Sequence, residues 1–435
     1  MDTGLEKKLQ SCQTDQQFPV SNVTQEETTG ELKVRVNSEI AELPVEDARI
    51  QIFNPDDPER ILYEGTTDAN GVTDVFELET PPLEYSMAPN ENQPYATYSI
   101  RVLKQGYDTQ VITGAQILPT AMGQQNVKLL PNEESEELGE RIVIGPHTLF
   151  GDYPPKIPEE EIKPTQESGE IVLSRVVIPE YVVVHDGVPS DSTAENYYVR
   201  YSDYIKNVAC CEIYATWPEN TIMANVLAIM SFTLNRVYTE WYRNKGYNFT
   251  ITTSTAYDHK WMFGKTIYDS ISNVVDQLFN NYLSRPNVVQ PILTQYCDGK
   301  RVTCPGWMTQ WGSKYLGDQN YTPIEILRYY YGDSIYINSA EEIAGIPASW
   351  PGSDLTIGSS GAKVRQMQEQ LNRISDAYPR IPKIAVDGVY GQGTAEAVRT
   401  FQKIFDLPQT GVVDYPTWYK ISNIYVGVSR IAELV

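Results

Sequence analysis

Residues 131–170 divide the chain into parts that cannot share one continuous core. This segment holds eleven acidic residues against three basic ones, and Pro146, Pro154, Pro155, Pro158 and Pro164 are spread along it. Like charges repel and proline lacks a backbone donor, so such a segment buries too little apolar surface to fold alone. We therefore predict an acidic, proline-rich linker that is extended, exposed and open to proteases, with folded parts on either side.

The part before the linker shows the alternation of short β-strands. Apolar and polar residues alternate in residues 31–36, 48–53 and 98–103, and turn residues such as Gly71 and Gly106 separate or end these runs. This spacing predicts a β-sandwich-like module over residues 30–130. Its order of strands and turns resembles transthyretin-like and carboxypeptidase-regulatory-like modules, which implies no catalytic role. Residues 1–29 are polar and predict a flexible tail.

The part after the linker contains one acidic residue in unusual surroundings. Ile205 and Val208 share one face of a predicted helix, and Glu212 projects from the same face near the helix end. A buried carboxylate is costly unless it is paired or protonated, and an aromatic neighbour such as Trp217 raises its pKa. Glu212 is therefore a candidate general acid. The alternative is a structural carboxylate that forms an ion pair with Lys206 or another neighbour.

The order of motifs over about residues 175–340 resembles the SpoIID family. A long apolar helix follows Pro218, a threonine-rich loop covers residues 252–258, and residues 306–313 are similar to the family's Gly-Met-Ser-Gln-Tyr-Gly-Ala segment. The resemblance implies a mixed α/β catalytic domain over residues 171–350, with Glu212 as the catalytic acid.

The same resemblance implies which side chains hold the substrate. We expect binding by the polar and aromatic residues of these motifs, namely Trp217, Asn225, Ser231, Tyr257, Asp258, Tyr296, Gln310 and Trp311. The family usually has Gln and Arg where this chain has Asn225 and Met230, which predicts altered sugar contacts.

Residues 354–435 carry the pattern of a compact module of three helices. The turn from Asp387 to Gly391 and the pair Thr417-Trp418 resemble peptidoglycan-binding-1 domains. Glycine permits the tight turn, and an indole is large enough to close a small core. The resemblance implies peptidoglycan as the partner, with Asp387, Gly388, Tyr390 and Trp418 as characteristic residues of the module.

Charge and cysteine content restrict the partners further. The net charge of −23 disfavours nucleic acid and anionic membrane surfaces. Cys297 and Cys304 are close enough in sequence for one local bridge, whereas Cys210 and Cys211 are expected to be buried apolar residues. With three histidines in the chain and none close to Cys297 and Cys304, we expect no metal site and no cofactor.

Taken together, the motifs resemble clostridial spore cortex-lytic enzymes of the SleC type, which implies a multidomain α+β protein. The implied reaction is lytic transglycosylation of cortex peptidoglycan by Glu212 alone. Residues 30–130 would be a prepro region, and a Csp-type spore protease would activate the precursor at the linker. The first residues lack an apolar signal segment, so we expect synthesis in the mother cell and deposition in the cortex or coat region.

Two other functions fit the same residues. A muramidase would use Glu212 with Asp258 as its second carboxylate, because hydrolytic glycosidases generally need two. A protein that only binds peptidoglycan would keep Glu212 as a structural residue.

Overall fold

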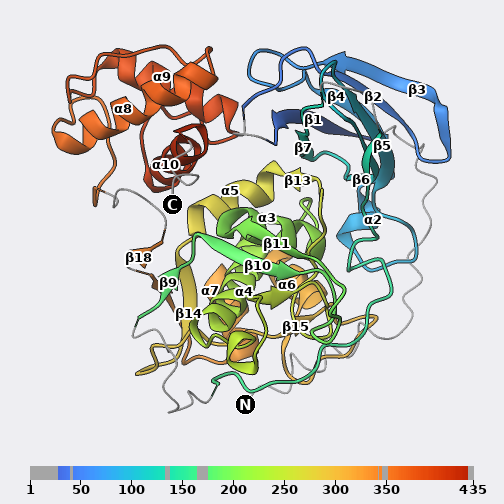
Figure 1. Ribbon diagram of the computed structural model, residues 1–435. Helices are drawn as coiled ribbons and strands as arrows, with labels where there is room; N and C mark the ends of the chain where they lie inside the picture. Colours follow the sequence, from blue (N-terminus) through green and yellow to red (C-terminus); the bar gives the residue numbers. More distant parts are fainter. Residues whose placement is uncertain are drawn as a thin grey trace.

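The computed structural model describes residues 28–39, 43–132, 138–163, 175–340, 342–344 and 351–429. It is a mixed α/β protein of several parts, as the sequence predicted. In Figure 1 a β module (blue to teal) and a helical module (orange to red) both lie above a central α/β body. The predicted tail falls almost entirely outside the described residues, although β1 already begins at Thr28. Among the described helices, none is long and apolar enough to cross a membrane.

Two sheets form the β module. One contains β1 (Thr28–Ser38), β4 (Phe76–Thr80), β7 (Met122–Leu129) and β13 (Ile267–Tyr268). The other contains β2 (Arg49–Asn54), β3 (Asp57–Thr66), β5 (Ala96–Leu103), β6 (Thr109–Ile117) and β8 (Leu138–Val143). The alternating apolar residues of both sheets meet in one core. A short helix, α2 (Glu84–Met87), lies between β4 and β5.

Segments from other parts of the chain complete both sheets. Strand β8 pairs in parallel with β6, although it lies within the predicted linker. Strand β13 belongs to the central body and pairs with β7 through Ile267 and Tyr268. The β module is therefore joined to the central body by backbone hydrogen bonds and is not an independent unit.

The central body is built around one helix that is buried on nearly all sides. This helix, α4 (Glu219–Tyr238), follows Pro218, whose extended backbone starts it. It packs against α3 (Tyr201–Glu212), α5 (Asp269–Leu278), α6 (Gln310–Asp318), α7 (Pro323–Tyr331) and β14 (Asn281–Ser284). A helix that is apolar all round can be stable only inside a core.

Short strands and one 3₁₀ turn complete the central body. The strands are β9 (Val177–Ile178), β10 (Tyr181–His185), β11 (Asn196–Arg200), β12 (Ile251–Thr252), β15 (Tyr296–Cys297), β16 (Met308–Thr309), β17 (Tyr336–Ser339) and β18 (Glu342–Ile343), and the turn is η1 (Arg243–Lys245). Parallel pairing of β15 with β16 brings Tyr296 beside the start of α6.

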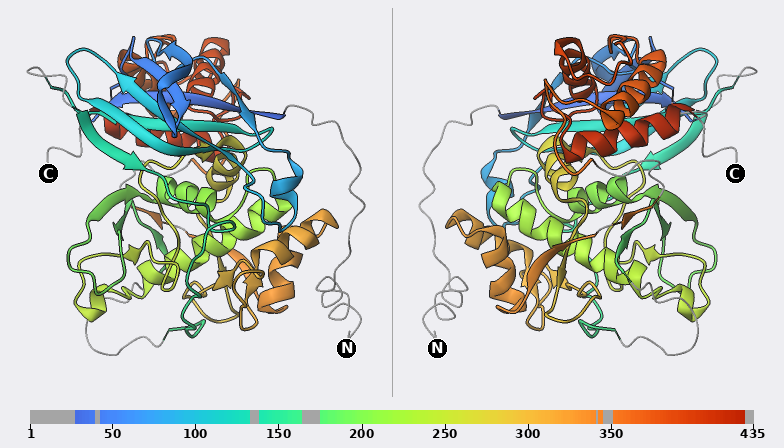
Figure 2. Two further views of the ribbon diagram at one scale, coloured as in Figure 1. Left: turned by 90° about the vertical axis from the view of Figure 1, so that its right-hand side faces the viewer. Right: turned by 90° about the vertical axis from the view of Figure 1, so that its left-hand side faces the viewer.

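The described part of residues 131–170 differs from the predicted extended, exposed linker in one respect: residues 151–163 form no helix or strand and many of them are exposed, but the segment also contains β8 and is attached to the central body by buried side chains. After β8, residues 144–163, here called the strap, descend along the central body (Figure 2). Lys156 and Lys163 are buried, and the carboxylate of Glu161 accepts two hydrogen bonds from Arg285 at 2.6 and 2.7 Å. The composition of the segment suggested self-repulsion, but cations more than 70 residues away neutralise its acids. Residues 133–137 and 164–170 lie outside the described residues.

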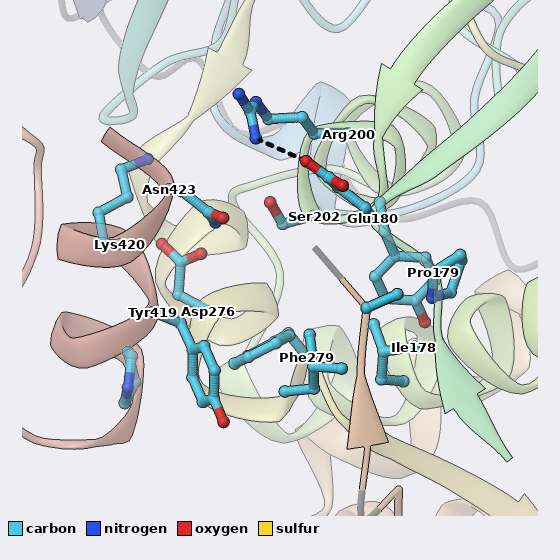
Figure 3. A pocket seen from close by; sticks show the side chains of 14 residues that line it. Ile178, Pro179, Glu180, Arg200, Ser202, Asp276, Phe279, Tyr419, Lys420 and Asn423 are labelled. Carbon is cyan, nitrogen blue, oxygen red and sulfur yellow. Dashed lines mark ion pairs between the residues drawn. The ribbon is translucent and has the colours of Figure 1, made fainter. Parts of the chain in front are cut away.

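The helical module consists of α8 (Ala362–Ala377), α9 (Gln392–Ile404) and α10 (Tyr415–Ser429). Its last helix lies against the central body, where Tyr415 and Tyr419 contact the ring of Phe279 at about 5 Å. Figure 3 shows the crevice at this junction, with Tyr419 of α10 facing Phe279, which directly follows α5, and with Asp276 of α5 nearby. The module thus rests on the central body through aromatic packing.

Candidate functional site

Glu212 is the last residue of α3 and is 4% exposed. Its Oε1 accepts a hydrogen bond from the backbone N–H of Lys260 at 2.9 Å. Its Oε2 accepts from Gln310 Nε2 at 3.1 Å and from Thr148 Oγ1 at 3.2 Å. The alternative of an ion pair with Lys206 is wrong, because the ammonium of Lys206 lies 2.6 Å from Asp276.

Burial dominates the acidity of this carboxyl group. It raises the pKa of Glu212, while the charge of Lys156 and the three hydrogen bonds oppose the rise without cancelling it. Burial likewise lowers the pKa of Lys156 to about 8. A carboxyl group with a raised pKa keeps its proton closer to neutral pH, as a general acid requires.

The strap covers Glu212. The space beside the carboxyl group has a volume of about 50 Å³, and Thr148, Gly151, Tyr153 and Pro154 of the strap form one side of it. Ligand pockets usually measure about 300–1,000 Å³. In this conformation the space is therefore too small for a sugar ring.

Gln310 and the two tryptophans stand close to the acid but face the protein interior. Besides contacting the Glu212 carboxylate, Gln310 Nε2 donates to the Glu212 carbonyl oxygen at 2.7 Å. The rings of Trp217 and Trp311 lie 5.0 Å apart, and both are buried. The indole N–H of Trp217 donates to the carbonyl of Ser86 in α2 at 2.9 Å, which links the site to the β module. Gln310 thus holds the acid, and the two tryptophans pack behind it.

Three residues predicted to bind substrate are instead buried inside the central body, where their side chains form hydrogen bonds with other parts of the protein. Asn225 donates to the carbonyl of Thr221 and to the hydroxyl of Ser313. The hydroxyl of Ser231 bonds to the backbone of β14 and to the carbonyl of Ile292. Both are buried polar side chains of α4, and the helical pattern of the sequence could not show which way they face.

Asp258, the third of these residues, has no exposed surface. Its two oxygens accept four hydrogen bonds, from Arg236 Nε at 2.7 Å, Tyr242 Oη at 2.6 Å, and the backbone N–H and hydroxyl of Thr252 at 2.9 and 2.7 Å. A carboxylate that is fully buried and accepts four internal hydrogen bonds, one at Oδ1 and three at Oδ2, is a structural centre that a substrate does not reach in this conformation.

Tyr296 and Tyr257 lie on opposite sides of the strap. Tyr296 lines the space beside Glu212, and its hydroxyl is 2.7 Å from Nδ1 of His259. Tyr257 is partly exposed and lines a second, larger groove. The other residues predicted to bind substrate, which are named above, are all buried. Tyr257 differs from them because its ring is partly exposed.

In the helical module, the predicted residues mainly support the turn between α8 and α9. Asp387 Oδ1 accepts from Gln368 Nε2 and from the N–H of Val389. Gly388 has a φ of +75°, and an added Cβ would lie 3.2 Å from the carbonyl oxygen of Gly361. Tyr390 and Trp418 are each 1% exposed and belong to the core.

Sequence reasoning did not identify the strap residues that meet Glu212. Thr148 and Lys156 carry no motif, and their proline-rich surroundings indicated an exposed segment. The N–H of Lys260 was also missed, because a backbone donor leaves no trace in a sequence. Cys297 and Cys304 are joined by a disulfide, and Cys210 and Cys211 are buried and free. Within the described residues, no group of three or more His, Cys, Asp or Glu side chains is arranged to hold a metal.

Several solved structures match a short part of this chain. The crystal structure of the SleB N-terminal domain is 30% identical, and the match covers 18% of this chain and 99% of that one, with a TM-score of 0.16. The Bacillus anthracis TIE protein is 18% identical over 24% of this chain and 17% of its own, with a TM-score of 0.17. The minor pilin GBS52 of Streptococcus agalactiae is 10% identical over 26% of this chain and 49% of its own, with a TM-score of 0.18. A comparison with curated proteins finds no matching sequence.

The comparison with protein families identifies the helical module. Residues 360–421 match the family described as "Putative peptidoglycan binding domain". The match spans α8, α9 and the first part of α10, together with the turn at Gly388. The helical module is therefore similar to peptidoglycan-binding domains over residues 360–421.

Proposed function

We propose that this protein is the precursor of a spore cortex-lytic enzyme, a lytic transglycosylase that cleaves the glycan strands of cortex peptidoglycan. The observation that carries the proposal is the buried carboxyl group of Glu212, whose pKa is raised, in a chain that also matches a peptidoglycan-binding domain. The helical module would hold the enzyme on its insoluble substrate, and the central body would cleave it.

In this mechanism one carboxyl group performs both proton transfers. Glu212 protonates the oxygen that bridges muramic acid and glucosamine, and the C1–O bond breaks. The resulting carboxylate then accepts the proton of the muramic C6 hydroxyl as that oxygen attacks C1 and closes a 1,6-anhydro ring. No water is consumed, so no second carboxylate is needed. The complete burial of Asp258 and its four hydrogen bonds to internal donors favour this mechanism over a muramidase that needs two accessible carboxylates.

The strap suits a precursor that is inactive until it is cut. Its first part, around Thr148 and Tyr153, covers Glu212, while its second part is tied to the central body by Glu159 and Glu161. A spore protease of the Csp type would cut the chain upstream of the strap. The new end, which begins with β8, would then detach from β6 and carry Thr148 away from Glu212, while the second part stayed bound.

Product analysis tests the reaction. Purified cortex is incubated with the activated parent, with Glu212→Gln, and with Glu219→Gln as a matched control on an exposed residue close to the acid. We expect anhydro-muramic ends from the parent and the control, and a loss of at least about 10²-fold for Glu212→Gln. New reducing ends would instead identify a muramidase, and no released fragments would identify a binding protein.

Controlled cleavage tests the precursor. The recognition sequence of a site-specific protease is inserted within residues 133–137 of the full chain, and a scrambled, uncleavable insert serves as the control. We expect activity on cortex only after the cleavable chain is cut. An uncut chain that digests cortex as fast as the cut chain would show that the strap does not inhibit.

A further inference from the structure

A second groove, far larger than the space beside Glu212, lies on the other side of the strap. Its volume is about 560 Å³, which is within the range of small-molecule sites. One wall comes from the second part of the strap, including Ile157 and Lys163, and the other from residues 241–247 and Tyr257. This groove takes no part in the chemistry described above.

The walls of the groove combine aromatic rings with two lysines, Lys163 and Lys245, and two carboxylates, Glu159 and Glu160. Trp241, Tyr247 and Tyr257 line it, and each is at least partly exposed. Such rings offer flat apolar faces on which the C–H groups of a sugar pack, and tyrosine adds a polar tip. This arrangement accounts for part of the unusual tyrosine content of the chain, which has 30 tyrosines and 10 phenylalanines.

Lys245 supplies a cation for the ligand. Its ammonium lies 3.3 Å from the centre of the Trp241 ring and is exposed at the rim of the groove. By contrast, the buried ammonium of Lys163 is 2.6 Å from Glu159 and is therefore already neutralised. Among the described residues no carboxylate lies within ion-pair distance of Lys245, which leaves it available to an anion.

The groove and Glu212 flank the same crossing of two chain segments. The N–H of Ile157 donates to the carbonyl of Ala256 at 2.7 Å, which ties the strap to the loop after β12. On one side of this crossing, Lys156 and Thr255 line the space beside Glu212, and on the other, Ile157 and Tyr257 line the groove. The strap and this loop therefore separate the two spaces, and the groove is a distinct surface next to the site of Glu212.

We propose that the groove is a saccharide subsite that binds a carboxylate-bearing amino sugar, the muramic acid unit of peptidoglycan. The sugar ring packs on Tyr247 and Tyr257, and its carboxylate lies against Lys245. The proposal rests on peptidoglycan being the substrate and adds a second glycan site to the chain, separate from the helical module. Because the strap forms one wall, residues 156–163 must remain in the active enzyme.

Binding of soluble disaccharides to the full chain tests the subsite. Every protein carries Glu212→Gln, so that no ligand is consumed, and calorimetry compares the N-acetylglucosaminyl-N-acetylmuramic acid disaccharide with the neutral N,N′-diacetylchitobiose. The double variant Tyr247→Ala, Tyr257→Ala should weaken binding of both sugars by about tenfold or more. Tyr198→Ala, which removes a ring that is 75% exposed on β11, is the matched control and should bind like the parent.

The variant Lys245→Met separates the two parts of the proposal. It should weaken binding of the muramic disaccharide while leaving chitobiose unchanged. If the double tyrosine variant binds both sugars like the parent, the subsite does not exist, and if Lys245→Met affects neither, the carboxylate is not recognised there. Because binding is measured without cleavage, these results are independent of whether Glu212 is the catalytic acid.

Discussion

The attachment of the strap to the central body depends on the carboxylate of Glu159. The loss of folding free energy when this carboxylate is removed can be estimated from its contacts. Glu159 pairs with the guanidinium of Arg236 through two hydrogen bonds of 2.6 and 3.1 Å, and it also pairs with Lys163. The Arg236 side chain has no exposed surface and that of Glu159 is 13% exposed. Glu159→Gln keeps the shape of the side chain but leaves a buried cation with Asp258 as its remaining partner.

Removing one partner of a buried ion pair costs about 3–5 kcal/mol. Because Asp258 still neutralises Arg236, we expect a value at or below the lower limit of this range, about 2–3 kcal/mol. For a folded unit of 150–250 residues, each kcal/mol lowers Tm by about 2–4 °C. Glu159→Gln should therefore lower Tm by about 5–10 °C in a thermal unfolding experiment at neutral pH.

The neighbouring residue provides the control. Glu160 is exposed, and Glu160→Gln should change Tm by at most about 1–2 °C, since surface substitutions usually change stability by about 0.5 kcal/mol or less. Equal Tm values for the two variants would refute the reasoning, because they would mean that Glu159 does not hold the strap.

The same pair predicts a dependence on pH. Although burial opposes the ionisation of Glu159, Arg236 and Lys163 outweigh it and hold the pKa of Glu159 below its ordinary value of 4.5. A carboxylate with a depressed pKa stabilises the fold above that ordinary value, and the stabilisation is lost as the pH falls through the lower pKa of the folded state. The difference in Tm between the parent and Glu159→Gln should therefore be full at pH 7 and shrink below about pH 4.

Three further predictions concern the acid and the helical module. Gln310→Ala removes a hydrogen-bond donor to Glu212 and should therefore raise the pKa of Glu212 further. The activity of the activated enzyme should then fall at a higher pH on the alkaline side of its pH profile. An unchanged pH profile would contradict this role of Gln310. Deleting residues 354–435 should weaken binding to insoluble peptidoglycan yet spare cleavage of soluble fragments, whereas equal loss on both would mean that the module shapes the active site. Gly388→Ala should cost about 1–2 kcal/mol in chemical denaturation because its φ is +75°, whereas Gly393→Ala, with open space around it, should not destabilise the chain.

Several features of this protein follow from local patterns alone. Period-two alternation indicated the strands around Val34 and Ile100, and a helical repeat indicated α3 and α4. Both patterns are local because a strand or a helix repeats its geometry every two or 3.6 residues. The position of Glu212 at the end of α3 follows from the same repeat. The turn at Gly388 was recognisable because its backbone conformation favours glycine.

The tertiary structure decided the course of the strap and the roles of the polar residues. Lys163 meets Gln290, 127 residues away, and Glu159 meets Arg236, 77 residues away. No local composition records such partners, so the acidic segment gave the appearance of an exposed linker. Asn225 is likewise a polar residue on a helix, and whether it faces a substrate or a backbone carbonyl depends on what packs against it. The cost of burying a charge or an amide is offset only by partners that folding brings together, and these are set by the tertiary structure.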